Sequence, residues 1–425
     1  MAVLLTHWFH TRRFAVRGKA AKRASQPRGF HGRHGNAITM GMQPGKVQYL
    51  EGLRGIAAMQ VVLLHFVTGF MPSTVTHVWP PLRIVFDGHT AVYVFFLISG
   101  AVLTPSFARP GSFAVKLTRR VVRLGIPVAA AAAVATVLLM SLPDAHRRAA
   151  AITHSAWLAM DSSGAPTLAH VAREIGLDSL LLGYREATLF GPLVPYLPPM
   201  ERSLDAPFWS LHLELYGSLL VLCLVSLRAW SLVAHRVAIV AAALAFATHP
   251  MFLFVVGHLL QPHSPRHGAR GGGKTLTGLA VLLFGIALCA SKDWRTVEWP
   301  RQLLCHTELA CAPNLFQFQS QLGAIALYLG VLWCPLVWPI LESTPCRYIG
   351  RLSFSIYLLH FPILFTIVCA AFMVIPSVFV AFLLLLGVTL LAAIGFERTV
   401  DRPAIALSRR IGRIQRRSSF TSASA

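Results

Sequence analysis

The sequence contains little charge, and this shortage excludes most soluble folds. Only 13% of the 425 residues are charged and 55% are hydrophobic, whereas about 25% of the residues of a soluble domain are charged. A chain this long would usually form two or three soluble domains, which so few charges could not cover with a polar surface. We therefore exclude an ordinary cytosolic enzyme and expect a polytopic membrane protein.

Acidic residues are scarce as well, at 16 against 38 Lys and Arg. Such a basic excess can indicate nucleic-acid binding. Here, however, the basic residues lie between apolar stretches and at both ends of the chain, as in membrane proteins. We expect a lipid bilayer as partner and no nucleic acid.

Paired cysteine motifs are absent, because none of the seven cysteines forms a CxxC pair. This argues against a zinc site and against a disulfide-rich scaffold, and we expect no metal. Cys305 and Cys311 are separated by five residues. They could form a disulfide in an oxidising compartment or stay as two free thiols.

Both ends of the chain read as basic tails. Residues 1–47 hold nine Lys or Arg and no acid, which indicates a disordered tail or, less simply, a mitochondrial transit peptide. Residues 406–425 form a second tail, rich in Arg and Ser. Between the tails, residues 48–405 are expected to form one membrane domain.

The membrane domain is predicted to be an all-α bundle of about ten transmembrane spans. A span needs about 20 predominantly apolar residues. The apolar stretch 231–261 is too long for one span and contains Pro250, which breaks helices. Counted once, it gives nine spans with the two basic tails on opposite sides, which the positive-inside rule disfavours, so we count it as two. The other expected spans are 49–71, 90–107, 121–141, 207–227, 275–290, 321–341, 352–374 and 377–396.

An even number of spans puts both basic tails on one side, which the positive-inside rule identifies as the cytoplasm. We expect this orientation in a plasma or secretory-pathway membrane. The long connection 142–206 then faces the lumen or exterior, and it holds seven of the sixteen acids. It could be a lid or a surface for a polar acceptor, or a poorly packed insertion.

Ionisable residues inside expected spans indicate function, because burying them in lipid is costly. Arg54 and His65 are eleven residues apart in the first span, so they share a helix face and lie about 16 Å apart along the axis. An extended ligand could contact both. A histidine bonded inside the bundle and an arginine reaching the interface are the structural alternatives.

Two further groups carry charge into spans. Arg120 and Arg123 are three residues apart, so they point the same way on a helix and could clamp an anion or simply flank a span. Glu214 lies near the start of a later span, at the level His65 reaches, so the two side chains could meet.

A phosphate-loop pattern occurs at Gly268–Thr275. A true phosphate loop follows a strand and opens a soluble helix, whereas this one precedes an apolar stretch. We do not expect it to bind ATP.

Several blocks, in this order along the chain, resemble the membrane-bound acyltransferase family 3. They are Leu50–Ala58 with His65, Tyr93–Gly100, Phe208–Glu214 and Tyr348–Pro362, and the stretch Phe396–Pro403 resembles the last-helix ending of the fungal branch.

This resemblance implies transfer of an acyl group, often acetyl, from acyl-CoA to a hydroxyl of a carbohydrate, lipid or small-molecule acceptor. The family signatures map onto Arg54 with His65, and onto Arg120 with Arg123. The Glu51 position is often Asp in the family, and 142–206 contains no matching motif, so the acceptor is not indicated.

The expected mechanism makes His65 the general base, because its pKa is ordinarily near neutrality. Glu214 would orient it, and Arg54, Arg120 and Arg123 would bind the acyl-CoA. His360 is the second choice of base. A transporter of an anionic or acylated molecule is the competing function, since buried Arg, His and Glu also build ion pathways.

Overall fold

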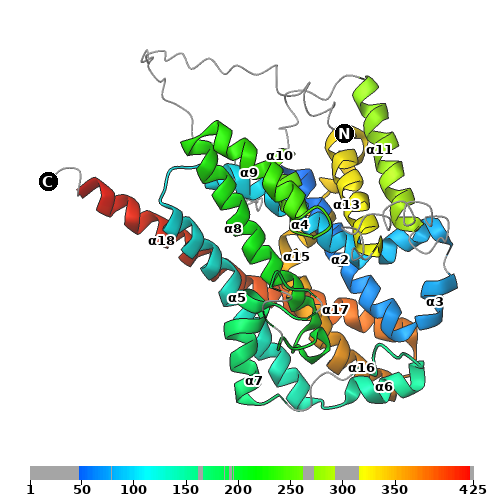
Figure 1. Ribbon diagram of the computed structural model, residues 1–425. Coiled ribbons are helices and arrows are strands. Elements are labelled where there is room, and N and C mark those ends of the chain that lie inside the picture. Colours follow the sequence, from blue (N-terminus) through cyan, green and yellow to red (C-terminus); the bar gives the residue numbers. More distant parts are fainter. Residues whose placement is uncertain are drawn as a thin grey trace, which may run out of the picture. The chain divides into compact units, whose positions relative to one another are not determined.

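The computed structural model describes residues 47–77, 79–160, 166–185, 187–190, 194, 196–261, 272–291 and 315–421. These residues form helices and their connections, without a β-strand among them (Figure 1). The main helices are α2 (Gln48–Phe70), α4 (Gly88–Phe107), α5 (Phe113–Ser141), α8 (Trp209–Trp230), α11 (Gly272–Ala290), α13 (Leu315–Trp333), α15 (Thr344–Ile363) and α17 (Val378–Phe396). The prediction of an all-helical membrane protein is confirmed.

The predicted count of ten spans is not confirmed. Within the described residues, seven helices are long and apolar enough to span a membrane, or eight if the pair Gln317–Trp333 and Pro335–Leu341, bent by 83°, counts as one. The stretch 231–261 forms α9 (Leu232–Ala245) and α10 (Phe252–Leu259), of 14 and 8 residues. Both are shorter than the thickness of a bilayer requires.

The two short helices return the chain to the side it came from. Figure 1 shows the end of α8 and the beginning of α11 at the same end of the bundle. Whether α9 and α10 are counted as two spans or as none, the total number of spans therefore stays even or stays odd, and the relative sides of the two ends of the chain do not change.

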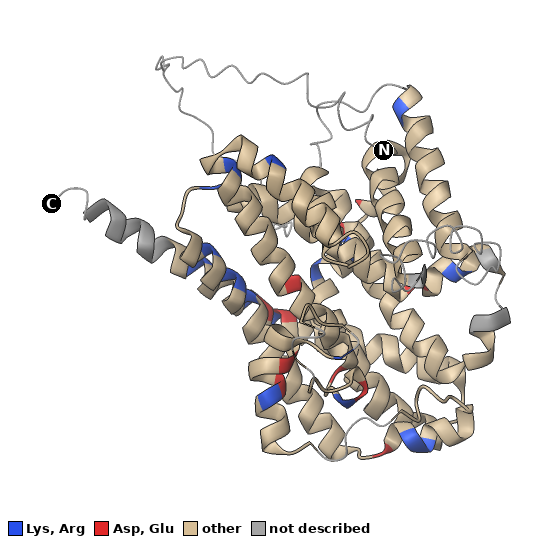
Figure 2. Ribbon diagram, in the orientation of Figure 1, with Lys and Arg blue, Asp and Glu red and all other residues tan. Residues whose placement is uncertain are grey.

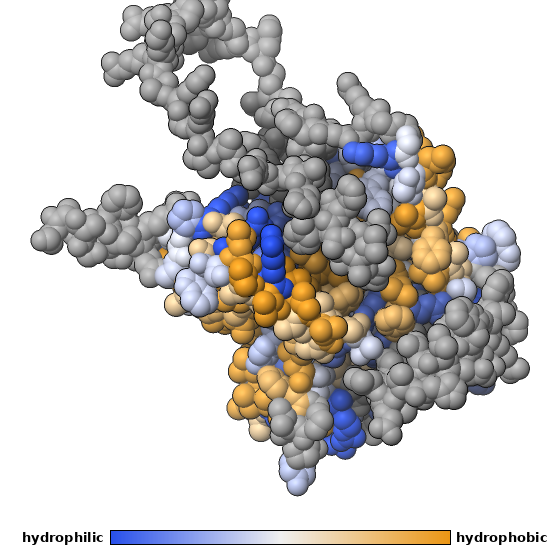
Figure 3. All heavy atoms as spheres, turned by 45° about the horizontal axis from the view of Figure 1, so that its top comes forward, coloured by the Kyte–Doolittle hydropathy of each residue, from blue (hydrophilic) through white to orange (hydrophobic). Residues whose placement is uncertain are grey.

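The outer surface of the helices is apolar, as lipid contact requires. Figure 3 shows hydrophobic side chains spread over this surface. Several large ones are more than half exposed, among them Val137, Val233, Leu244, Phe379 and Leu391.

Glycines let α2 and α15 touch along their backbones. A Cβ on Gly350 would lie 1.9 Å from the carbonyl oxygen of Glu51, and a Cβ on Gly55 would lie 2.7 Å from the Gly350 nitrogen. Small residues permit such close approach between membrane helices. Because the contact is this close, it fixes the register between the two helices.

The described part of the connection 142–206 is packed, which argues against the alternative of a loose insertion. It contains α6 (Ala145–Thr153), α7 (Leu168–Arg173), the π-helix η2 (Glu174–Leu182) and the short 3₁₀ helix η4 (Met200–Arg202). The buried Glu174 carboxyl group accepts hydrogen bonds from the Tyr184 and Ser203 hydroxyls through Oε1. This network ties three parts of the connection together, and the Leu189 N–H donates to His212 Nε2 of α8 at 3.2 Å.

The chain ends in a helix where a tail was predicted from residue 406. A π-helical turn, η11 (Glu397–Asp401), leads from α17 into α18 (Arg402–Thr421), which packs along α5. The Ser408 hydroxyl donates to the Arg119 carbonyl, and Gly412 lies against the Arg119 side chain. The N-terminal tail up to residue 46, Cys305 and Cys311 lie outside the described residues.

Candidate active site

Two histidines from different helices meet inside the bundle. His65 on α2 lies ten residues after Gly55, and His360 on α15 lies ten residues after Gly350. The two helices run parallel, and the two glycines are in contact. Because each histidine follows its glycine by the same ten residues, the two histidines lie at the same level and meet. The distance between His65 Nδ1 and His360 Nε2 is 2.8 Å.

The hydrogen bonds define the tautomers of this histidine pair. His360 Nδ1 lies 3.0 Å from the carbonyl oxygen of Ile356, which can only accept, so Nδ1 carries the proton. In a neutral ring the other nitrogen is then an acceptor. His65 Nδ1 therefore donates to His360 Nε2, and the second nitrogen of His65, Nε2, has an unprotonated lone pair. His65 is thus the free base of the pair, and His360 orients it.

Aromatic rings enclose the imidazole of His65. The indole of Trp157 stacks on it with ring centres 5.4 Å apart and planes 9° from parallel. Phe361 meets it edge-on at 5.5 Å. His65 nevertheless retains partial exposure, so a small group could reach it.

Glu214 does not orient His65, contrary to the prediction. Its carboxylate is paired with Arg120 and accepts a 2.7 Å hydrogen bond from the Ser99 hydroxyl on α4. Arg120 also donates to the Ser218 hydroxyl, one turn after Glu214 on α8, at 2.7 Å. Glu214 therefore lies on the side of α8 that faces α5. Its carboxylate largely neutralises the charge of Arg120.

An arginine cluster thus replaces the predicted two-residue clamp. It comprises Arg54, Arg120 and Arg123, with Glu214 and with Asp401 of η11. Electrostatic interactions link Arg54 to Arg123, Glu214 and Asp401, and they link Arg123 to Asp401 and to Arg409 of α18. Arg54 also interacts with Glu51, and Arg123 is exposed. Figure 2 shows acidic and basic segments close together where α5 meets the C-terminal helix.

The arginine cluster and the histidine pair lie at two levels of one continuous helix. Arg54 and His65 are both on α2, which is unbroken from Gln48 to Phe70. Eleven residues of helix rise about 16 Å. Tyr357, one turn before His360, lies between the levels: its ring centre is 6.1 Å from that of His360, and its hydroxyl donates to the Pro207 carbonyl at 2.9 Å.

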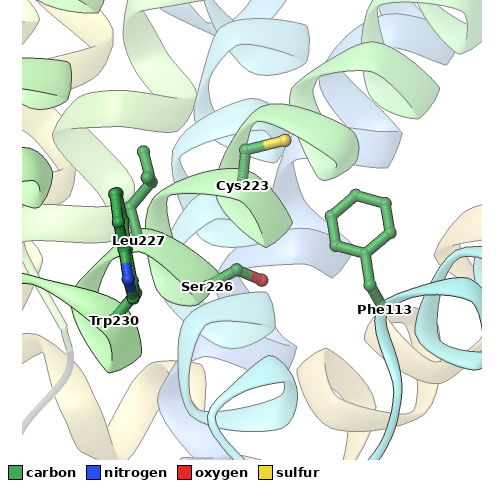
Figure 4. A pocket seen from close by; sticks show the side chains of 5 residues that line it. All are labelled: Phe113, Cys223, Ser226, Leu227 and Trp230. Carbon is green, nitrogen blue, oxygen red and sulfur yellow. The ribbon is translucent and has the colours of Figure 1, made fainter.

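Other candidate sites carry less chemistry. In the phosphate-loop pattern, Gly272–Thr275 lie in the first turn of α11, a candidate span, and the rest lies outside the described residues. No group of three or more potential metal ligands occurs in the part of the chain that the structure describes. Phe113 and α8 form a groove of about 450 Å³ that contains none of the predicted site residues. Figure 4 shows the side chains that line it. Its other lining residues are Cys223, Ser226, Leu227 and Trp230.

Comparison with known proteins identifies the family. The sequence model of the acyltransferase domain matches residues 47–398. The chain belongs to this acyltransferase family. The O-acetyltransferase PaAT-1 of Phomopsis amygdali is 25% identical over 371 residues, which cover 75% of this chain and 72% of the relative. No solved structure matches significantly. The predicted resemblance, and with it an acyltransferase activity, is confirmed.

Three contributors to the site were not predicted from the sequence. Trp157 belongs to a connection without a family motif, Ser99 is a single polar residue among apolar neighbours, and Asp401 is one of several charged residues after the last apolar stretch. The direct pairing of His65 with His360 was missed too. The equal ten-residue offset from a glycine to a histidine in both helices was its signal in the sequence.

Proposed function

We propose that this acyltransferase moves an acyl group, most simply acetyl, from acyl-CoA to a hydroxyl of an acceptor, with His65 as general base. The observation that carries the proposal is the histidine pair. Its hydrogen bonds leave His65 Nε2 as a free lone pair in a partly accessible position. The name of the 25% identical relative supports oxygen as the acceptor atom and acetyl as the group.

The chemistry needs one proton acceptor and no covalent acyl-enzyme. His65 Nε2 takes the proton of the acceptor hydroxyl while its oxygen attacks the thioester carbon. The tetrahedral intermediate then collapses, the carbon–sulfur bond breaks, and His65 returns the proton to the sulfur of CoA. His360 Nε2 accepts the hydrogen bond from His65 Nδ1 throughout, so the base keeps its orientation. Such general-base catalysis contributes about 10²–10⁴ in rate.

The arginine cluster suits the anionic end of the donor. Arg120 is occupied by Glu214, so in our proposal Arg123 and Arg54 contact the phosphates. Guanidinium groups bind phosphate through charge-assisted hydrogen bonds. The separation of about 16 Å between Arg54 and His65 along α2 lets an extended donor place its thioester beside the histidine. The donor would enter from the cytoplasm and the acceptor from the side of the connection 142–206.

Release of free thiol from acetyl-CoA by the purified protein tests this function. Glucose, cholesterol and geraniol would represent carbohydrate, lipid and small-molecule acceptors. We expect thiol release that depends on one of these alcohols and yields its acetate ester. Ester formation without any dependence on His65 would contradict the proposed base.

Sealed vesicles separate this function from transport, since buried Arg, His and Glu also occur in transporters. Radiolabelled acetyl-CoA, glucose or geraniol would be offered outside vesicles containing the protein. Accumulation of an unmodified compound without thiol release would favour a transporter and overturn the enzyme proposal.

A further inference from the structure

The connection between α5 and α8 reaches back into the bundle and docks beside His65. The Ser155 hydroxyl donates to the Thr68 carbonyl of α2 at 2.9 Å. Leu158 is fully buried, and a Cβ on Gly69 would lie 3.3 Å from its side chain. The turn 155–158 is therefore fixed to the last turn of α2, directly beyond the histidine.

This docking puts Trp157 into an aromatic cluster around the base. Besides stacking on His65, the indole meets Phe361 edge-on at 5.8 Å and Phe365 at 5.1 Å. Phe361 stacks on Phe365 with ring centres 4.2 Å apart. The indole is thus held from two sides, so the face of His65 that it covers is defined by packing.

The charge formed during the reaction has no carboxylate beside it. The electrostatic neighbours of His65 are His360 and His89, with no acid of the described residues among them, and Glu214 is held by Arg120. An imidazolium at His65 must be stabilised by other means. The face of an indole attracts a cation by about 0.5–2 kcal/mol, with Trp the strongest of the aromatic residues.

Trp157 follows a short helix that has a residue of positive φ at each end. This helix, α6, is bounded by Asp144 and His154 with φ of 57° and 53°. These are the two non-glycine residues with positive φ in the part of the chain that the structure describes. His146 of α6 packs against Phe365 at 5.1 Å. The same helix α15–η10 segment (Thr344–Val368) therefore supports His360, the aromatic cluster and α6.

We propose that Trp157 is a positioning residue for the acyl transfer, which covers one face of His65, stabilises its protonated form and forms a wall of the acceptor site. This inference rests on the proposed role of His65 as base. It assigns to the described segment 144–158 of this connection the function of covering the acceptor side of the site.

The first test measures how well the indole covers His65, and it needs no acceptor. The purified protein would be treated with diethyl pyrocarbonate, and modification of the His65 peptide would be followed by mass spectrometry. We expect Trp157→Leu to raise the modification rate of His65 at least about threefold, because the covered face becomes accessible. Modification of the buried His258 serves as internal control, and Trp338→Leu, which removes an indole stacked on Tyr49, serves as matched variant.

The second test separates positioning from a merely structural role. With the best acceptor of the panel, Trp157→Leu should lower kcat by about 2- to 30-fold, the range of one lost cation–π contact, and raise the KM for the acceptor while the KM for acetyl-CoA stays unchanged. Trp157→Phe should restore most of kcat. Ser155→Ala, which keeps the indole but removes the bond that docks its turn, should raise the acceptor KM alone.

Two outcomes would overturn the inference. One is an unchanged His65 modification rate in Trp157→Leu; the other is unchanged kcat and acceptor KM in both Trp157→Leu and Ser155→Ala. If instead His65→Ala keeps its activity, the proposed base itself is wrong, and the two failures are thereby distinguished. Since Ser155→Ala preserves every large side chain, it keeps the test valid if Trp157→Leu does not fold.

Discussion

The two ends of the site bury ionisable groups in different ways. In the arginine cluster, each buried charge has an opposite charge nearby, as Arg120 has Glu214. At the histidine pair and in the connection beyond it, two buried groups have uncharged partners: His65 has His360, and Glu174 has the hydroxyls of Tyr184 and Ser203.

This difference matches the two tasks that an acyl transfer imposes. A polyanionic donor needs fixed positive charge, which paired guanidinium groups retain because arginine does not lose its proton. Proton transfer needs a group that can change its charge, and a neutral histidine pair can do so. The predictions below test this contrast between a charged and a neutral end, beginning with the largest effect.

Removing the free base should abolish most of the reaction. In His65→Ala we expect thiol release from acetyl-CoA in the presence of acceptor to fall by about 10²–10⁴. His360→Ala should have a smaller effect, because it removes the orienting partner and leaves the base. Equal losses in the two variants would show that the rings act as one unit, and a larger loss in His360→Ala would exchange their roles.

Breaking the Arg120–Glu214 pair should reduce stability as well as activity. Removing one partner of a buried ion pair costs about 3–5 kcal/mol, because the other charge is left unpaired. We expect Glu214→Ala to lower the melting temperature in detergent. The double variant Arg120→Met with Glu214→Leu should recover most of the stability.

This second variant is the control that decides the interpretation. A double variant as unstable as Glu214→Ala would contradict the assignment of charge pairing as the cause. Recovered stability without recovered activity would show that the pair is also needed for function.

Most of the candidate spans could be predicted from the sequence, because an apolar stretch of about 20 residues is long enough to cross a membrane. Eight expected stretches correspond to candidate spans, with 321–341 bent near Cys334. The prediction that 231–261 forms two spans was not confirmed. Hydropathy measures how apolar a segment is, and it cannot distinguish two spans from two short helices that do not cross the membrane. Pro250 marked the break correctly.

The site was predictable where residues share a helix and unpredictable where helices meet. Arg54 and His65 lie on α2 as expected, since helical periodicity fixes their separation. Glu214 was expected to meet His65 because both lay at a similar estimated depth. Depth, however, does not determine which neighbour a helix faces, and Glu214 faces Arg120 on α5.

Arg123 should act on the donor alone. Its exposed guanidinium forms no direct ion pair like that of Arg120 with Glu214, and without it the buried Asp401 still has Arg54 as a neighbouring cation, so Arg123→Ala should leave folding intact. Loss of one charge-assisted contact to phosphate, worth about 1.5–3 kcal/mol when buried, should raise the KM for acetyl-CoA about tenfold at this exposed position. Arg109→Ala, a substitution on the α4–α5 connection, provides the matched control. An unchanged acetyl-CoA KM in Arg123→Ala would remove this residue from the donor site.

The smallest expected effect concerns the neutral end, where Glu174 makes the connection 142–206 sensitive to pH. Burial raises the pKa of Glu174 from 4.5 to about 7, so the folded connection binds a proton that the unfolded chain releases near pH 4.5. Stability is therefore fully present below pH 4.5 and is lost as the pH rises through about 7, since folding is weakened wherever the folded state binds more protons.

Protease resistance of the connection measures this dependence. We expect cleavage within 142–206 to become faster between pH 5 and pH 8, after correction for the protease's own pH profile on an unfolded substrate. In Glu174→Gln the dependence should become weaker, because the amide keeps the shape and can still accept from the hydroxyls of Tyr184 and Ser203 without titrating. The remainder comes from Asp178 and Asp205, because burial raises the pKa of both carboxyl groups too. Glu201→Gln, a substitution in the same connection, should behave like the wild type. Cleavage that slows with rising pH would mean that Glu174 is buried as a carboxylate, and that the neutral end is charged after all.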